Sequence, residues 1–134
     1  MTTATQTEGD VTIAITRDPA LVRTVRLVAA AVARRAACQD AMIEEIRLAV
    51  GEACAVMIGP DGLESPVAEQ DGQVEVQLRT EGQFTVTVTG RVDGVDDGFA
   101  DVGVDPWALL QGLSEDVSVT EEDGVTRLTM SWPL

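Results

Sequence analysis

Two cysteines, Cys38 and Cys54, have side chains that could act as thiolate nucleophiles or bind zinc. Their spacing matches no metal or redox motif. The chain also contains no histidine that could activate a thiolate or complete a zinc site. We therefore expect no metal site and interpret both cysteines as packing residues.

A helix-like segment from Glu45 to Ile58 carries the sequence Glu-Ala-Cys-Ala-Val, which begins at Glu52 and ends at Val56. The segment resembles the ATP-site helix of the anti-sigma-factor serine kinases, small members of the histidine-kinase-type (GHKL) ATPase superfamily, in which Glu-Ala-x-x-Asn supplies a general base and a metal ligand. The resemblance implies that Glu52 corresponds to the base that accepts the proton of a substrate serine as Mg-ATP transfers its γ-phosphoryl group. The simpler interpretation of Glu52 is an exposed carboxylate that pairs with Arg47 or faces solvent.

The resemblance covers nearly the whole chain, from Val11 to Pro133. It includes an arginine-bearing first helix and a closing segment from Ala108 to Val119, which is followed by a strand from Gly124 to Met130. The ordered set of these motifs, and not any one of them, carries the resemblance.

Three positions at which the family holds nucleotide differ in this chain. Val56 stands in place of the magnesium ligand, and valine has no oxygen to offer a hard cation. The family's Asp-x-Gly-x-Gly loop, whose aspartate reads adenine, aligns best with Gly90 to Gly94, which puts Gly90 in the place of the aspartate. A shifted register onto residues 96–98 restores the acid but not the second glycine. The glycine-rich lid is reduced to residues 101–106, which offer one glycine and two acids that repel phosphate.

These departures predict a degenerate ATP site. We therefore expect no cofactor, with Mg-ATP as the cofactor only under the alternative that the chain is an active kinase. Glu52 is then a vestigial general base, and Val56, Gly90 and Gly94 are degenerate nucleotide-binding positions.

A predicted partner surface lies on the first helix, which the Asp18-Pro19 capping signal opens and which runs to about Ala37. At about 100° per residue its core stripe consists of Leu21, Val25, Val28, Ala29, Val32 and Ala36. The opposite face carries an apolar strip bracketed by two cations, namely Arg23, Leu27, Ala30 and Arg34. The resemblance places Arg23 at the position of an arginine that contacts the sigma factor. The alternative is that this surface leucine is incidental and that the arginines only solubilise an Ala-rich helix.

Periodicity predicts the other elements. A second helix runs from about Asp40, whose side chain could cap it, to Ile58, and a short helix spans Pro106 to Leu113. Alternating apolar residues predict strands at 11–15, 73–80, 84–89, 117–119 and 126–132, with turns at Glu81-Gly82 and Asp123-Gly124. The inward residues of the two hairpins include Val74, Val76, Leu78, Phe84, Val86, Val88, Leu128, Met130 and Trp132.

The order of these elements predicts an α/β fold of two layers. Each strand is apolar on one side only, which favours a mostly antiparallel sheet with helices on one face and solvent on the other. This is the Bergerat-type arrangement that the GHKL resemblance implies. A length of 134 residues suits one domain, so we expect a loose tail over residues 1–10 and a single domain over residues 11–134.

Composition excludes several classes of partner. Nine Lys and Arg against 23 Asp and Glu give a net charge of -14, which disfavours nucleic acid. The sequence contains no apolar run of about 18 residues and no signal-peptide pattern at its start, so we expect a cytoplasmic protein that does not span a membrane. The simpler interpretation of this acidity is that it keeps the protein soluble. The second interpretation is that it attracts a basic protein partner.

The leading hypothesis is an anti-sigma-factor-like regulator that binds a sigma factor, an anti-anti-sigma antagonist, or both. The family usually acts as a homodimer, so a homodimer is expected. The alternative is an active ATP-dependent serine kinase of an anti-anti-sigma protein, with Glu52 as its base. A third hypothesis keeps only the fold and adapts the pocket to another small ligand.

Overall fold

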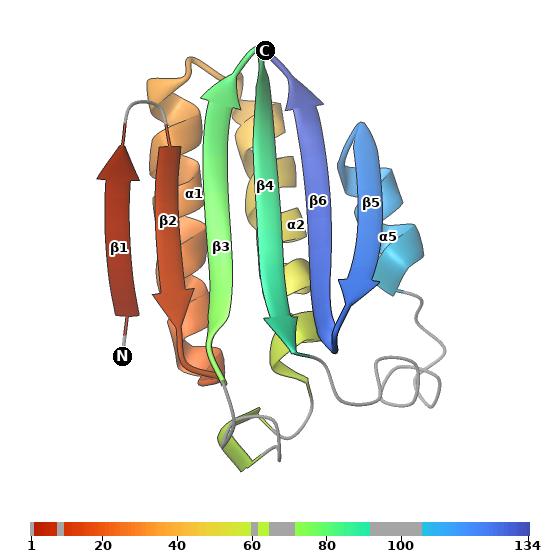
Figure 1. Ribbon diagram of the computed structural model, residues 1–134. Helices are drawn as coiled ribbons and strands as arrows, with labels where there is room; N and C mark the ends of the chain where they lie inside the picture. Colours follow the sequence, from red (N-terminus) through yellow and green to blue (C-terminus); the bar gives the residue numbers. More distant parts are fainter. Residues whose placement is uncertain (1, 8–9, 60–61, 65–71, 92–105) are drawn as a thin grey trace.

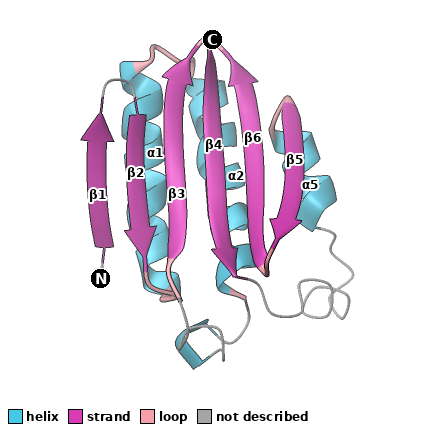
Figure 2. Cartoon of the chain, in the orientation of Figure 1, coloured by secondary structure: helices cyan, strands magenta, loops and turns pink. Residues whose placement is uncertain are grey.

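The protein is a two-layer α/β sandwich with a six-stranded sheet in the order β1-β2-β3-β4-β6-β5. The computed structural model describes residues 2–7, 10–59, 62–64, 72–91 and 106–134. The strands are β1 (Thr2–Thr7), β2 (Asp10–Ile15), β3 (Val74–Glu81), β4 (Gln83–Arg91), β5 (Asp116–Glu122) and β6 (Val125–Pro133), and the α-helices are α1 (Val22–Arg35), α2 (Asp40–Ile58) and α5 (Pro106–Leu113). The helices cover one face of the sheet and leave the other open (Figures 1 and 2). The predicted fold class is confirmed.

Strict alternation of residue types creates the two faces of the sheet. Every strand pairing is antiparallel, and directly opposite residues therefore share a face. On the helix-covered face, Phe84 stacks edge to face on Trp132, with ring centroids 6.3 Å apart. The inward hairpin residues that the sequence predicts are all buried.

Both predicted hairpin turns form where glycine permits a positive φ. Gly82, at φ 74°, connects β3 to β4. Asp123 and Gly124, at φ 54° and 79°, connect β5 to β6, and positive φ at both central residues is the requirement of a type I′ turn. The pairing registers of β3 with β4 and of β5 with β6 follow from these turns.

The beginning of the chain differs from the prediction. Residues 2–7 form the edge strand β1, paired antiparallel with β2 from Thr2↔Ile15 to Thr7↔Asp10, where the sequence predicts a loose tail. Four of these six residues are threonine, a β-branched residue that suits a strand. The segment contains no apolar alternation that would have predicted a strand, and its pairing with β2 is the observed feature that defines it.

Helices α1 and α2 form an antiparallel hairpin packed on the sheet and on each other. Asp18 accepts a hydrogen bond from the amide of Ala20 at 3.0 Å, as the cap predicts, and Pro19–Leu21 then forms a 3-10 turn before α1. The helix ends at Arg35, two residues earlier than predicted, because Ala37 adopts φ 62°. The amide of Cys38 then donates to the carbonyl of Ala33 at 3.1 Å, as in a Schellman motif.

Helix α2 begins at Asp40, so this residue is the first of the helix and not its cap. The preceding residue, Gln39, makes no side-chain capping hydrogen bond. The helix ends at Ile58 and is followed by Gly59, whose φ of 76° is accessible to glycine without a Cβ penalty. None of the described helices combines the length and the apolar character that a membrane span requires.

Candidate functional site

The segment that resembles an ATP-site helix is the middle and end of α2. Val56, at the position of the family's metal ligand, is only 2% exposed. Helix α5 packs against α2. Glu52, one turn earlier, is half-buried. Arg47 does not pair with Glu52 but with Glu44, at 3.0 Å, which corrects the interpretation of Glu52 as an ion-pair partner of Arg47.

The position that should read adenine is also enclosed. Gly90, near the end of β4, is buried on the helix-covered face. A Cβ atom built there would lie 3.6 Å from Val74 Cγ2 and 3.7 Å from both Cβ and Sδ of Met57. A carboxylate at this position would therefore point among apolar groups. Gly94, residues 96–98 and residues 101–105 of the predicted lid lie outside the described residues.

Arg17 joins the end of α2 to the end of β4, and sequence reasoning does not identify it. Its side chain is 1% exposed and donates to the carbonyls of Met57, Ile58 (3.2 Å) and Arg91. The guanidinium thereby satisfies carbonyls that the last turn of a helix leaves free, and its charge complements the helix dipole. Burial lowers the pKa of Arg17 from its ordinary value.

Close packing around Arg17 also explains why residue 62 is a glycine. Gly62 has φ 52°, and a Cβ atom at this position would lie 3.2 Å from the carbonyl oxygen of Arg17. Any side chain would therefore be strained there.

The predicted partner strip on α1 is only partly exposed. Arg23, Leu27 and Arg34 are exposed, with Leu27 at 54%. Ala30 is 2% exposed and belongs to the core, so its assignment to an exposed strip is wrong. The reason is that α1 packs against both the sheet and α2, which buries more than one stripe of the helix.

At the contact between α1 and α2, Gly51 leaves room for the side chain of Arg26. The Cδ atom of Arg26 lies 3.1 Å from the point where a Cβ of Gly51 would sit, so the arginine stem packs over the bare α2 backbone. The Nε atoms of Arg26 and Arg47 are both shielded from solvent and have no hydrogen-bond partner. Arg47 nevertheless pairs with Glu44 through its Nη1 atom, so only its Nε donor lacks a partner.

The two cysteines behave as packing residues. Cys54 is completely buried on α2, and burial raises the pKa of its thiol to about 12. Burial also raises the pKa of Cys38. Both are free thiols. Among the described residues, no group of three or more His, Cys, Asp or Glu side chains is placed to hold a metal ion.

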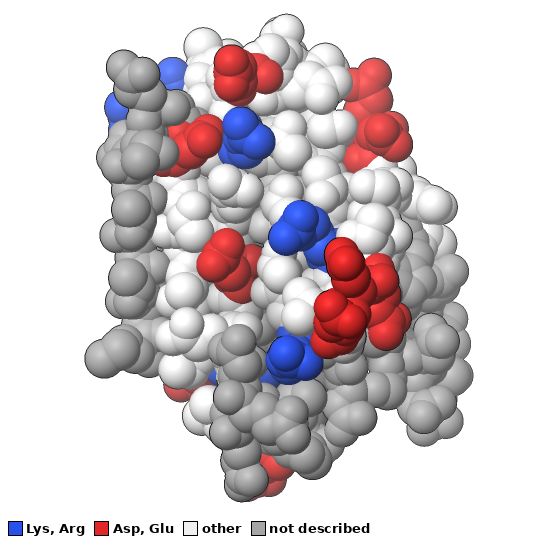
Figure 3. Space-filling view, viewed as in Figure 1, with Lys and Arg blue, Asp and Glu red and all other residues white. Residues whose placement is uncertain are grey.

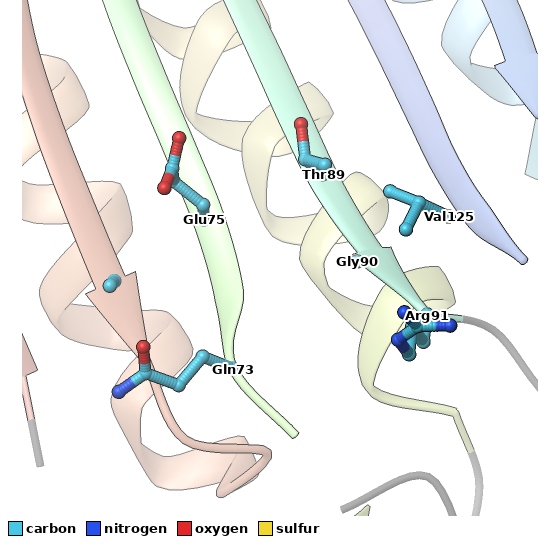
Figure 4. A pocket seen from close by; sticks show the side chains of 7 residues that line it. Gln73, Glu75, Thr89, Gly90, Arg91 and Val125 are labelled. Carbon is cyan, nitrogen blue, oxygen red and sulfur yellow. The ribbon is translucent and has the colours of Figure 1, made fainter. Parts of the chain in front are cut away.

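A hollow of about 230 Å³ lies on the open face of the sheet, away from the helices. The residues that line it are Ala14, Gln73, Glu75, Thr89, Gly90, Arg91 and Val125 (Figure 4). Figure 3 shows this open face, on which positive and negative side chains are interspersed among uncharged ones. Gly90 contributes its backbone to this hollow, whereas Val56 lies in the helical layer on the other face of the sheet.

Comparisons with known proteins agree with the fold described above. The model of the histidine kinase-like ATPase domain matches residues 15–132. The chain belongs to this family. A solved structure of the RsbU and RsbW domains of Rv1364c from Mycobacterium tuberculosis is similar, with a TM-score of 0.67 at 16% identity. The match covers 93% of this chain and 32% of that chain, and a likeness at this identity shows the fold. No curated protein matches the chain.

Proposed function

We propose that this member of the histidine kinase-like ATPase family is an anti-sigma-factor-like regulator that acts by binding and not by phosphoryl transfer. Its partner is a sigma factor, an anti-anti-sigma antagonist, or both, in the cytoplasm. The observation that carries the proposal is the exposed Leu27 between Arg23 and Arg34 on α1. The RsbW-like fold supports the choice of partner class.

A degenerate nucleotide site is the second part of the proposal. A magnesium ligand must present an oxygen to the bound nucleotide, but position 56 holds a buried valine. An adenine-reading aspartate needs a polar opening, and the surroundings of Gly90 are Val74 and Met57. Burial of an unpaired carboxylate among such groups is unfavourable. Glu52 is in this view a remnant of the family's general base.

The charge of α1 supports a protein partner on this helix. Between Asp18 and Asp40 the chain has four arginines and no acid, although the whole chain carries a net charge of -14. Arginine is enriched at the energetically important positions of protein interfaces, since it contributes both apolar stem area and planar hydrogen bonding, and the exposed Leu27 adds apolar area beside it.

The binding proposal is tested with purified sigma factors and anti-anti-sigma proteins from the genome that encodes this chain. Calorimetric titration of each should find at least one partner, and the double variant Arg23→Glu with Leu27→Asp should lose binding while remaining folded by circular dichroism. The matched control is Arg127→Glu with Val119→Asp, two exposed positions on the sheet. Equal binding by wild type and the α1 variant would refute this partner surface. Light scattering on the same samples tests the expected homodimer.

The alternative function is an active serine kinase, and the half-buried state of Glu52 keeps it open because the carboxylate is accessible to a substrate. Calorimetric titration with Mg-ATP separates the two functions. We expect no binding. Micromolar binding, together with phosphorylation of an anti-anti-sigma serine that Glu52→Gln abolishes, would replace the binding proposal with the kinase.

A further inference from the structure

Strand β5 forms one edge of the sheet. In the order β1-β2-β3-β4-β6-β5 it pairs with β6 on one side, and no other strand among the described residues pairs with it. Figure 1 shows its outer edge at the side of the molecule. The outward amides and carbonyls of an edge strand can pair with another chain, so this edge can accept a further strand.

The helical layer covers β5 only in part. Val117 is half-buried and packs against the core, opposite the fully buried Met130 of β6. Val119 lies opposite Leu128, which is also fully buried, so Val119 faces the same helical side of the sheet. Nevertheless, Val119 is 46% exposed. The edge therefore presents an uncovered apolar side chain beside its backbone.

The charges along β5 have one sign. From Glu115 to Asp123 the chain has five acidic residues and no basic one, and all five are exposed. Within the described residues, none of these carboxylates forms an ion pair. Arg127, the cation of the neighbouring strand β6, lies opposite Thr120. Figure 3 shows acidic side chains along this edge of the open face. The edge thus has an excess of negative charge.

We propose that the outer edge of β5 accepts an extended, basic segment of a partner protein, which joins the sheet as an added strand. Pairing with the edge satisfies the backbone groups of the segment, and its alternate side chains provide specificity. On the helical face an apolar side chain packs beside Val119. On the open face, lysine or arginine side chains meet Asp116 and Glu122. The segment is therefore one in which apolar and basic residues alternate.

A second copy of this chain does not fit the same edge. Two β5 strands side by side would bring acidic residues together, and like charges directly opposite each other are destabilising. Charged side chains commonly protect edge strands from self-association in this way. The protection does not extend to a partner of opposite charge. The inference also goes beyond the proposed function, because it concerns the edge of the sheet and not α1.

A designed peptide tests the edge without an identified partner. The probe is an extended peptide of about eight residues in which valine alternates with lysine, so that one side is apolar and the other basic. Titration into the ¹⁵N-labelled full chain should shift the amides of β5 in a saturable way and slow their hydrogen exchange. The same peptide with glutamate in place of lysine should bind at least about tenfold more weakly. Shifts confined to other elements, or no binding, would overturn the proposal.

Backbone methylation separates strand addition from attraction between charges alone. A peptide whose central amides are N-methylated keeps its lysines but cannot donate hydrogen bonds to β5 in either chain direction. It should bind at least about tenfold more weakly than the unmethylated peptide. Equal affinities would show that the peptide is held by its charge, and would refute the added strand.

A charge exchange locates the site. Asp116→Lys with Glu122→Lys should lose binding of the lysine peptide and gain binding of the glutamate peptide, and both exposed positions tolerate the change. The matched control is Glu75→Lys with Glu81→Lys, which makes the same change of charge at exposed positions of β3. It should still prefer the lysine peptide. An unchanged preference in the β5 variant, or the same reversal in both variants, would place the binding elsewhere and refute the site.

The α1 variant keeps this inference separate from the proposed function. Arg23→Glu with Leu27→Asp should bind the lysine peptide as wild type does, whatever its effect on sigma factors or antagonists. Loss of peptide binding in this variant would place the peptide on α1 and overturn the β5 edge.

Discussion

Two positions on α2 differ in their access to solvent. The position of the family's metal ligand, Val56, is buried and apolar, whereas Leu48 is about half exposed and lies beside an arginine. Glu52 lies between them along the helix and is half-buried, so access to solvent decreases from Leu48 to Val56. The contrast teaches that accessibility, more than motif likeness, decides which surface of a helix can meet another molecule.

The largest expected effect concerns Arg17, which binds the last two carbonyls of α2. Arg17→Met leaves three backbone carbonyls without their donor inside the protein. The free energy of unfolding should fall by about 3 kcal/mol, measured by chemical denaturation. Arg79→Met is the control, because Arg79 is half exposed and pairs with Asp10 at 3.5 Å, and should cost less than about 1 kcal/mol. Similar losses in both variants would contradict this account of Arg17.

The contrast itself is tested by one substitution at two neighbouring positions. Val56→Asn restores the family's residue type at a buried site and should lower the free energy of unfolding by about 2 kcal/mol, because its amide has no partner there. Ala55→Asn places the same side chain at an exposed position and should cost less than about 1 kcal/mol. A stable Val56→Asn variant that binds Mg-ATP would break the contrast.

Alkaline pH probes the burial of α2 through Cys54. The folded-state pKa of its thiol is raised from 9.0 to about 12, so its contribution to stability is fully present below pH 9 and is lost as pH rises toward 12. The free energy of unfolding should fall by about 1.4 kcal/mol per pH unit in this window. The chain has no lysine, tyrosine or histidine, so the thiols dominate side-chain titration there.

Cys54→Ala is the matched variant for this pH dependence. It should start from a lower stability, because it leaves a small cavity, but its unfolding free energy should fall less steeply between pH 9 and about 11. The same slope in wild type and variant would show that another group controls the alkaline transition.

The smallest effect on the free energy of unfolding is expected at the exposed leucines of α1 and α2. Leu27→Asp and Leu48→Asp should each change the free energy of unfolding by less than about 0.5 kcal/mol, because both side chains already face solvent. Leu110→Asp, at a fully buried leucine of α5, should lower the free energy of unfolding strongly in the same chemical denaturation experiment. A large loss of stability from Leu48→Asp would mean that this side of α2 is structural.

Local patterns predict most of the fold. Alternation identifies β2, β3, β4, β5 and β6, and the Asp123-Gly124 turn predicts the last hairpin. The edge strand β1 escapes prediction because its residues show no apolar period. The site is less predictable, since Ala30 has the helical spacing of an exposed residue and becomes buried through its position beside α2.

Sequence alone determined the types of the elements, the inward residues of the strands, the family resemblance and the position of the arginine-rich, acid-free helix. Tertiary structure decided that Val56 is enclosed, that Ala30 is in the core, and that Arg17 binds carbonyls 40, 41 and 74 residues away. The physical reason is that periodicity encodes one apolar side of an isolated element. A second packing surface, or a hydrogen bond to distant backbone, exists only once the elements have been assembled.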